Sequence, residues 1–282
     1  MRNRVDGPTP KVIRRHGPWT RITHWMWAVC VFFLLLSGLQ IFNAHPVLYI
    51  GQQSGMTQGF DNAVLRIGAE GGQGAGPAKG VTQILGHRFD TTGFLGLSGP
   101  ADARQPRAFP AWATIPSSQD LATGRVVHIF FAWVLVGTLA VWAVASLVNG
   151  HLRRDILPGR RDLRGLGRDI IAHLRGPLRH GRRYSPLQKL TYFAVFFALF
   201  PLMILTGLTM SPGMDAAWPL LLDLFGGRQT ARSLHFLGMV LIVAFFVVHI
   251  AMVLVAGPLN ELRSIVTGRY RITGNGQATE EH

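Results

Sequence analysis

Long apolar runs separated by polar segments dominate the pattern of this chain. Residues 126–148, 190–210 and 234–256 contain no Asp, Glu, Lys or Arg, and a fourth apolar run extends from Ile22 to Phe42. About 20 apolar residues are enough for an α-helix to cross a bilayer. Because a helix satisfies its own backbone hydrogen bonds in lipid, the pattern predicts an all-α integral membrane protein with a four-helix transmembrane bundle.

The predicted organisation has three parts: a basic N-terminus, a membrane domain at 22–256 and a polar tail. Within the membrane domain, four spans are separated by a long outer loop, a basic inner loop and a short outer loop. The expected boundaries, in chain order, are 1–21, 22–42, 43–123, 124–148, 149–186, 187–210, 211–230, 231–256 and 257–282.

Several local features add to this organisation. We expect Pro201 to kink the third span, because proline removes a helical hydrogen bond. The long segment 43–123 is rich in Gly, Pro and Ser, so we expect loops with a short helix or two. The sequence RDIIAHLR at 168–175 is typical of an interfacial amphipathic helix. The end of the tail, TGNGQATEEH, is expected to be disordered.

The formal net charge of +14 is distributed unevenly along the chain. Residues 149–186 hold ten Arg against three Asp, whereas the segment 43–123 holds five charges of each sign. Basic loops stay on the cytoplasmic side of bacterial membranes. The distribution therefore predicts a multi-pass protein of the bacterial inner membrane with both termini in the cytoplasm. It also explains the positive charge by topology and contact with anionic lipids, rather than by binding of nucleic acid.

Cys30 is the single cysteine, and it lies in the first apolar run. It has no partner for an intrachain disulfide. The absence of a C-x-x-C-H motif argues against a covalently attached c-type haem, and iron–sulfur clusters need several cysteines. The basic start and first apolar run could also be a cleaved signal peptide, but the run is long for that.

Four of the eleven histidines lie in the predicted spans: His24, His128, His235 and His249. His235 and His249 are fourteen residues apart, which is about 40° short of four full helical turns and about 21 Å of rise. They therefore lie on nearly the same face of the last span. By depth, the four sort into an outer pair, His128 with His235, and an inner pair, His24 with His249.

Ionisable residues inside membrane spans are functional candidates. Two axial imidazoles per iron are what a low-spin, electron-transferring b haem requires, so the two pairs indicate two b haems. One alternative is that each histidine only bonds a neighbouring helix. A single shared metal is excluded by the separation along the last span, and a proton relay would favour acidic residues, which the spans lack.

Basic and small residues lie near the candidate ligands. Arg21, Arg125 and Arg232 are at the ends of spans, where a guanidinium could pair with a haem propionate. Small residues leave room for a macrocycle within the bundle. Those noted near the histidines are Gly38, Ala132, Gly137 and Gly238.

The sequences THWMWAVCVFFLLLSGLQI, GRVVHIFFAW and HFLGMVLIVAFFVVH resemble the di-haem cytochrome b subunits of respiratory formate dehydrogenases, nickel–iron hydrogenases and thiosulfate reductases, the prokaryotic cytochrome b561 family. The similarity extends over about 13–271. It implies two b haems in a four-helix core, which pass electrons between an outer catalytic subunit and the quinone pool. By position, His24 and His249 match the ligands of the inner haem, and His128 and His235 those of the outer haem.

A second similarity lies at RYSPLQKLTYF, residues 183–193. The corresponding segment of formate dehydrogenase cytochromes lines a quinone site beside the inner haem. Tyr184, Gln188 and Lys189 match that segment, whereas Ser185 replaces Asn and Leu187 replaces Gly. The resemblance implies that ubiquinone or menaquinone contacts Tyr184, Ser185, Gln188 and Lys189. An ordinary membrane-interface anchor is the alternative.

The long outer loop and the segments around 109–129, 205–236 and 256–270 look more like the thiosulfate-reductase-type branch. Members of that branch are often paired with periplasmic molybdopterin oxidoreductases, so the resemblance implies such a partner, docked on 43–123 and 211–230. Two rivals stay open. One is a stand-alone cytochrome b561 that reacts with quinone and superoxide or another small oxidant; the other is a haem-free membrane anchor or transporter.

Overall fold

The computed structural model describes residues 11–55, 60–72, 77–150, 152, 156–175 and 185–272. In these ranges, four helices are long and apolar enough to cross a membrane, which confirms the predicted helical, four-span architecture. The third span is built from three consecutive pieces. The bounds are α1 Pro18–Asn43, α2 Leu121–Val148, α4 Pro186–Ala194 with the π-helical turn η4 Val195–Leu199 and α5 Phe200–Thr209, and α8 Arg228–Ala256.

The π-helical turn η4 comes directly before Pro201. Proline has no N–H to donate, and its ring clashes with the carbonyl group four residues earlier. That carbonyl belongs to Phe197, inside the turn. A π-helical turn is one of the ways in which a helix accommodates such a break without ending. The expected distortion at Pro201 therefore takes the form of one widened turn.

By contacts the chain divides into two compact units, which are described separately. The terminal unit comprises Met1–Met26, Trp142–Phe193 and Ala244–His282; the central unit comprises Trp27–Val141 and Ala194–Val243. Each unit contains one of the two predicted histidine pairs.

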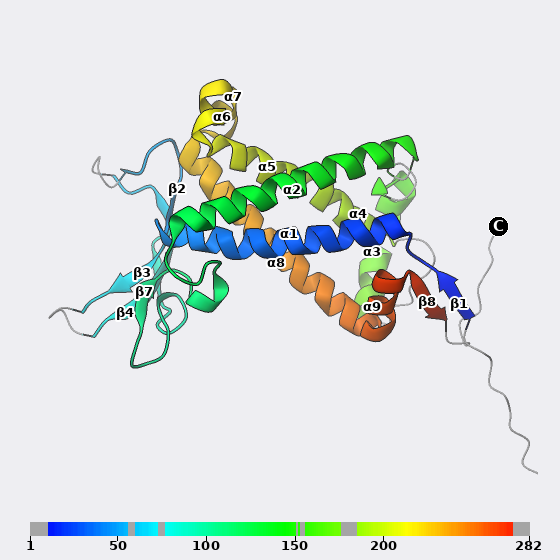
Figure 1. Ribbon diagram of the computed structural model, residues 1–282, viewed down its shortest axis with the longest axis horizontal. Coiled ribbons are helices and arrows are strands. Elements are labelled where there is room, and N and C mark those ends of the chain that lie inside the picture. Colours follow the sequence, from blue (N-terminus) through cyan, green and yellow to red (C-terminus); the bar gives the residue numbers. More distant parts are fainter. Residues whose placement is uncertain are drawn as a thin grey trace, which may run out of the picture. The chain divides into compact units, whose positions relative to one another are not determined.

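In the terminal unit, strands from the two ends of the chain pair with each other. β1, Lys11–Arg14, is antiparallel to β8, Arg269–Ile272, and both are visible as arrows beyond α9 (Figure 1). The helix α9, Pro258–Thr267, begins with proline and ends at Gly268 in the left-handed conformation. The Arg15 guanidinium forms an ion pair with Glu261 at 3.0 Å. These contacts give structure to residues that were predicted to be only a polar tail.

An amphipathic helix, α3, lies in the predicted basic inner loop at Arg160–Arg175, so the helix expected at 168–175 is present and begins earlier. Asp162 binds the Lys189 ammonium at 3.1 Å. An Asp169 oxygen accepts a hydrogen bond from the Leu187 backbone N–H at 2.9 Å. The two aspartates thus hold α3 against the start of α4.

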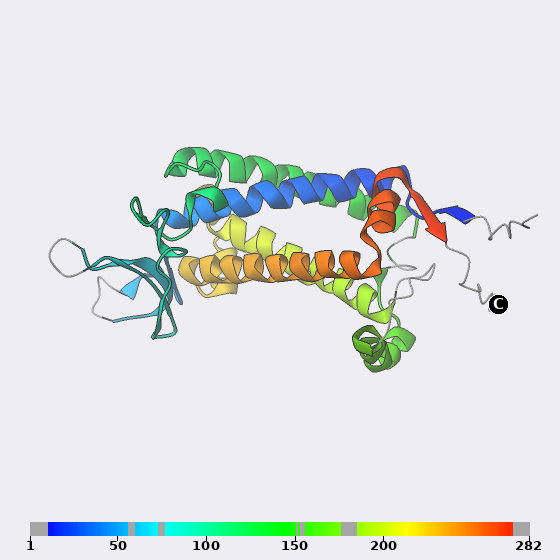
Figure 2. The same ribbon diagram turned by 90° about the horizontal axis from the view of Figure 1, so that it is seen from below.

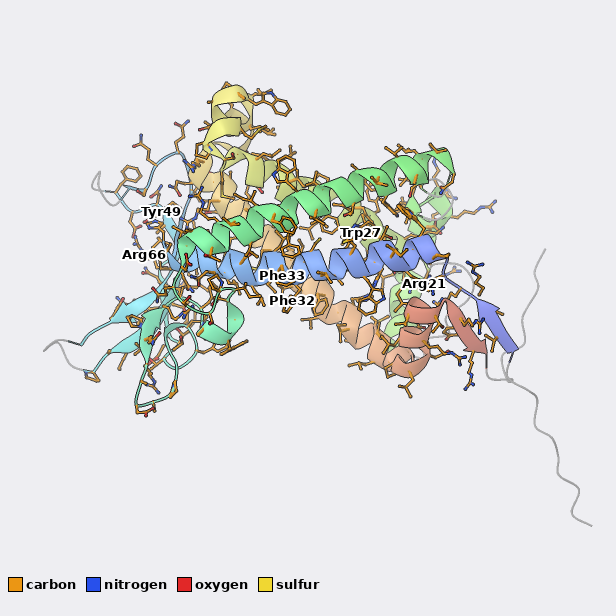
Figure 3. All side chains as sticks on the ribbon, viewed as in Figure 1. Arg21, Trp27, Phe32, Phe33, Tyr49 and Arg66 are labelled. Atoms are coloured by element: carbon orange, nitrogen blue, oxygen red, sulfur yellow. The ribbon has the colours of Figure 1, made fainter. Side chains whose placement is uncertain are left out.

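In the central unit, α1 and α2 contact each other along their length. The Trp27 indole N–H donates to the Thr138 hydroxyl at 3.1 Å. The rings of Phe33 and Phe131 are stacked with centroids 4.2 Å apart. The labelled positions of Trp27 and Phe33 on α1 can be followed in Figure 3. These contacts fix the spacing between the first two spans.

The expectation of loops with a short helix or two for 43–123 was incomplete, because this segment also forms β-sheets. Four strands make one antiparallel sheet in the order β2-β3-β4-β5, and two more form a separate pair. The cyan strands lie beyond the C-terminal end of α1 (Figure 2). The elements are β2 Val47–Tyr49, β3 Ala63–Glu70, β4 Lys79–Ile84, β5 His87–Asp90, β6 Gly96–Ser98, β7 Gln105–Arg107 and the short helix η2 Ala111–Ala113.

A small apolar core joins this sheet to the end of α1. Its buried members are Phe42, Leu48, Ile67 and Ala108. Beside it, Arg107 is only 6% exposed. Arg107 donates hydrogen bonds to the Phe109 and Ser117 carbonyls, the Thr114 hydroxyl and the Gln40 side chain. The segment 43–123, called the β-segment below, is therefore fixed to α1 by both apolar and polar contacts.

Two short helices connect the third and fourth spans, at α6 Pro212–Ala217 and α7 Leu220–Phe225. On α2, apolar side chains at helical spacing point away from the protein: Val126 is 69% exposed, Phe130 60% and Trp133 63%. A contiguous exposed apolar stripe of this kind is not stable in water. It is the surface expected of a helix that faces lipid.

Candidate functional site

The central unit brings His128 of α2 and His235 of α8 face to face. Their ring centroids are 6.3 Å apart, and the ring planes are inclined by 61°. Both side chains are partly buried. The two residues predicted to form the outer pair are thus neighbours, although more than a hundred residues separate them in the chain.

Each of these rings makes a hydrogen bond from Nδ1 to a buried hydroxyl group. The Ser37 Oγ lies 3.1 Å from His128 Nδ1, and the Thr206 Oγ1 lies 3.0 Å from His235 Nδ1. Neither hydroxyl-bearing side chain is exposed at all. With Nδ1 engaged, each ring keeps Nε2 for another partner.

Glycine follows each hydroxyl residue and lets the histidine ring approach the neighbouring helix. A Cβ atom added to Gly38 would stand 3.3 Å from His128 Cε1, and one added to Gly207 would stand 3.5 Å from His235 Cε1. Gly38 was noted from the sequence, but Ser37, Thr206 and Gly207 were missed. The signal that could have found them is a repeated tetrapeptide, Leu-Ser-Gly-Leu at 36–39 and Leu-Thr-Gly-Leu at 205–208.

The terminal unit brings the second pair together. The rings of His24, on α1, and His249, on α8, have centroids 6.4 Å apart with planes inclined by 48°. Trp25 packs edge-on against His24, and Phe245 stacks on His249. Aromatic rings therefore flank this pair on both helices.

The terminal pair differs from the central pair in its hydrogen bonding. The buried His24 Nδ1 has no hydrogen-bond partner among the described residues. Thr23, its neighbour in sequence, uses its hydroxyl to donate to the Trp19 carbonyl at 3.0 Å. The His24 ring is thus held by packing, whereas the central rings are held by packing and hydrogen bonds.

The three arginines proposed near propionates have different surroundings. Arg21 donates to the Val266 carbonyl at 2.9 Å, and its buried Nε has no partner in the described part of the chain. It lies near the start of α1 (Figure 3). Arg232 donates to the carbonyls of Val47 and His45, so it fastens the β-segment to α8. Arg125 lines a shallow hollow on α2 with Ala122, Val126, Ile129 and Phe130.

The predicted quinone residues lie at the start of α4, except Tyr184, which is outside the described residues. The Ser185 N–H donates to Gln188 Oε1 at 3.1 Å, and the Gln188 N–H donates to Ser185 Oγ at 3.3 Å. This reciprocal arrangement is a capping box, which satisfies two free donors at a helix N-terminus. Lys189 is paired with Asp162. All three described residues therefore have structural contacts of their own.

The other small residues noted from the sequence have different roles. Gly238 lies against Met203, because an added Cβ would come within 2.5 Å of its Sδ atom. An added Cβ at Gly137 would meet nothing within 4 Å, and Ala132 is partly buried.

In the part of the chain that the structure describes, no group of three or more His, Cys, Asp or Glu could hold a metal. The histidine pairs remain the candidate iron site.

Comparison with known proteins gives two matches. A family model described as prokaryotic cytochrome b561 matches residues 164–268. A protein of Azospira oryzae named putative protein-methionine-sulfoxide reductase subunit YedZ1 is 27% identical over 241 residues, which cover 84% of this chain and 89% of that protein. Members of the matched family bind haem b. Together with the four apolar helices, the two matches support assignment of the chain to the prokaryotic cytochrome b561 family, as a bacterial membrane cytochrome b subunit for electron transfer.

Proposed function

We propose that this chain is the di-haem membrane subunit of an oxidoreductase and transfers electrons between a periplasmic catalytic subunit and the quinone pool. His128 and His235 would hold one b haem, and His24 and His249 the other. The observation that carries the proposal is the spacing of the two histidine pairs.

The spacing fits axial ligation of iron. A metal–imidazole bond is about 2 Å long, so the ring centroid lies about 3 Å from the metal. Two imidazoles on opposite sides of one iron therefore have centroids about 6 Å apart. The measured separations are 6.3 Å for the central pair and 6.4 Å for the terminal pair. Two pairs on different helix combinations have nearly the same separation, which supports a common role.

The polar atoms of the two pairs also suit this cofactor. The Nδ1 atoms of His128 and His235 are engaged by hydroxyls, so Nε2 of each ring is the nitrogen available to a metal. Gly38 and Gly207 leave room for the rings against α1 and α5. A bound b haem supplies an iron that accepts and donates one electron. The Arg21 guanidinium, whose buried Nε has no partner among the described residues, is suited to pairing with a propionate in the terminal unit.

The proposed partner is a periplasmic oxidoreductase subunit. The name of the Azospira oryzae relative supports a partner of the methionine-sulfoxide reductase type, and the resemblance to the thiosulfate-reductase-type branch supports one that contains molybdopterin. The β-segment of the central unit is the proposed docking surface, with α6 and α7. Its charges are balanced and the basic segments lie elsewhere in the chain, which supports placing it outside and both termini in the cytoplasm.

The proposed quinone contact lies at Tyr184, Ser185, Gln188 and Lys189. Its support is the resemblance of this segment to a quinone-binding one. The capping box and the ion pair with Asp162 would then serve to hold the segment in place. Ser185 Oγ and the Gln188 amide N–H₂ are groups that can donate a hydrogen bond to a quinone carbonyl.

Haem content of the purified chain tests the proposal. The measurement is a reduced-minus-oxidised spectrum with a haem-to-protein ratio, made on the parent chain, His235→Ala, His249→Ala and the exposed control His87→Ala. We expect b-type spectra, loss of a different one of two haems in each of the first two variants, and no loss in the control. A folded chain without haem, or a single haem that survives both substitutions, would refute the assignment.

A further inference from the structure

We propose that Ser37 and Thr206 are positioning residues, which fix the protons of His128 and His235 on Nδ1. As a result, the haem held by this central pair has a lower reduction potential than the haem held by the terminal pair. The inference rests on the proposed function, because it concerns the haems that the two pairs would hold. It assigns a role to two residues that do not contact iron.

The direction of each hydrogen bond follows from the single proton of a hydroxyl group. Ser37 Oγ donates to the Phe33 carbonyl at 2.5 Å, and Thr206 Oγ1 donates to the Leu202 carbonyl at 2.6 Å. A hydroxyl has one proton to donate and two lone pairs that accept. Since both protons are used within their own helices, each hydroxyl can only accept from the histidine, and each Nδ1 must carry a proton.

Backbone groups repeat between the two halves of the central pair. The carbonyl of Leu34 lies close to the His128 ring, and the carbonyl of Met203 lies close to the His235 ring. Carbonyl oxygens only accept hydrogen bonds, so each favours a proton on the ring nitrogen that faces it. Leu34 and Met203 each lie three residues before the hydroxyl residue. The two halves of the central pair are thus built in the same way, on α1 and on α5.

A hydrogen bond from Nδ1–H makes the opposite nitrogen a stronger electron donor to a metal. A stronger donor stabilises ferric over ferrous iron and so lowers the reduction potential. Both rings of the central pair make such bonds. In the terminal pair, the buried His24 Nδ1 has no partner among the described residues. The chain's own hydrogen bonds therefore predict the lower potential for the central pair.

The test is a potentiometric titration of chains that keep a single haem. In the His249→Ala background the central haem would remain, and Thr206→Val would remove the hydroxyl with little change in shape. We expect the midpoint potential to rise, by about 59 mV for each tenfold loss of preference for ferric iron. Thr206→Ser should restore the parent midpoint, and Ser37→Ala should raise it. Thr209→Val is the matched control, because buried Thr209 donates only within α5, to the Leu205 carbonyl.

Two results separate this inference from the proposed function. A parent chain that purifies without haem would overturn both. Full haem content with midpoints that are the same in Thr206→Val, Thr206→Ser and the Thr209→Val control would overturn only the role of Ser37 and Thr206. The midpoint of the terminal haem can be measured in a His235→Ala chain, which would keep only that haem. A central haem with a higher midpoint than this would also overturn the inference.

A second measurement covers the case in which Thr206→Val does not retain haem. Nitrogen-15 NMR of the histidine rings in the haem-free, detergent-solubilised full chain reports which nitrogen carries the proton. We expect the parent His235 to be protonated on Nδ1 and the Thr206→Val ring to populate the other tautomer. An unchanged tautomer in that variant would contradict the inference.

Discussion

His128 and His235 stand 6.3 Å apart between ring centroids, and each is fixed by a helix other than its own. Ser37 of α1 contacts the first, and Thr206 of α5 contacts the second. The central pair therefore draws on all four spans. The position of each histidine ring therefore depends on small and hydroxyl-bearing residues of a neighbouring span, although such residues do not themselves bind iron.

Adding a branched side chain at Gly38 should displace His128. A Cβ there already approaches His128 Cε1 to 3.3 Å, and valine adds two methyl groups to it. We expect Gly38→Val to lose the haem of the central pair and keep that of the terminal pair, measured as haem per chain. The control is Gly137→Ala, which has open space around it and should keep both haems. Full haem content in Gly38→Val would contradict the packing argument.

Arg107 should be a main source of stability for the β-segment. Replacement by methionine would remove four hydrogen bonds and leave the buried Gln40 and Thr114 side chains without this partner. We expect a loss of about 3 kcal/mol in the stability of the segment, seen as faster cleavage by added protease. Arg88→Met, at an exposed ion pair, should have little effect. Equal cleavage rates in the two variants would rule out this role.

Acid should release α3 from α4. The Gly159 N–H, and then the Lys189 ammonium, hold the pKa of Asp162 below its ordinary value of 3.8. The pairing therefore contributes stability above pH 3.8, and that stability is lost as the pH falls through the lower pKa of the folded chain. We expect exchange of the Leu187 and Lys189 amide protons, corrected for intrinsic rates, to speed up only in strong acid.

Asp162→Asn should give the faster exchange already at neutral pH, at a cost of about 1 kcal/mol. Asp102→Asn, in the central unit, is the control and should leave these amides protected. Protection that persists in Asp162→Asn would show that Asp169 alone holds the two helices together.

Capping and quinone contact at the start of α4 can be separated by substitution. Glutamate can replace glutamine in a capping box, so Gln188→Glu should keep the helix start while placing a charge where a quinone carbonyl would bind. We expect an increased KM for quinone with unchanged thermal stability. Ser185→Ala should instead cost about 1 kcal/mol of stability. A Gln188→Glu chain with parent KM would remove Gln188 from the proposed quinone site.

The spans and the histidine pairs could be predicted because they depend on simple periodicity. Uncharged runs of span length identify α2 and α8, and a spacing of fourteen residues places His235 and His249 on one face. The sheet in 43–123 could not be predicted in this way. Its strands are only three to eight residues long. They depend on contacts between residues that are far apart in the sequence, such as Phe42 with Ala108 and Gln40 with Arg107.

The hydroxyl partners were missed for a related reason. A serine or threonine inside an apolar helix commonly bonds to its own backbone, and Ser37 and Thr206 do so. Their second contact, with a histidine of another span, depends on how the helices pack. The start of the tail was also missed, although Pro258 and Gly268 are ordinary signals for the beginning and end of a helix.

The order in which the chain is synthesised has a consequence for cofactor loading. Both histidine pairs take one member from α8, the last of the four apolar helices along the described chain. While α8 is still on the ribosome, His24 and His128 have no opposing imidazole. The proposed axial pairs can therefore form only after the last span has entered the membrane, so haem would be captured late, by a nearly completed chain.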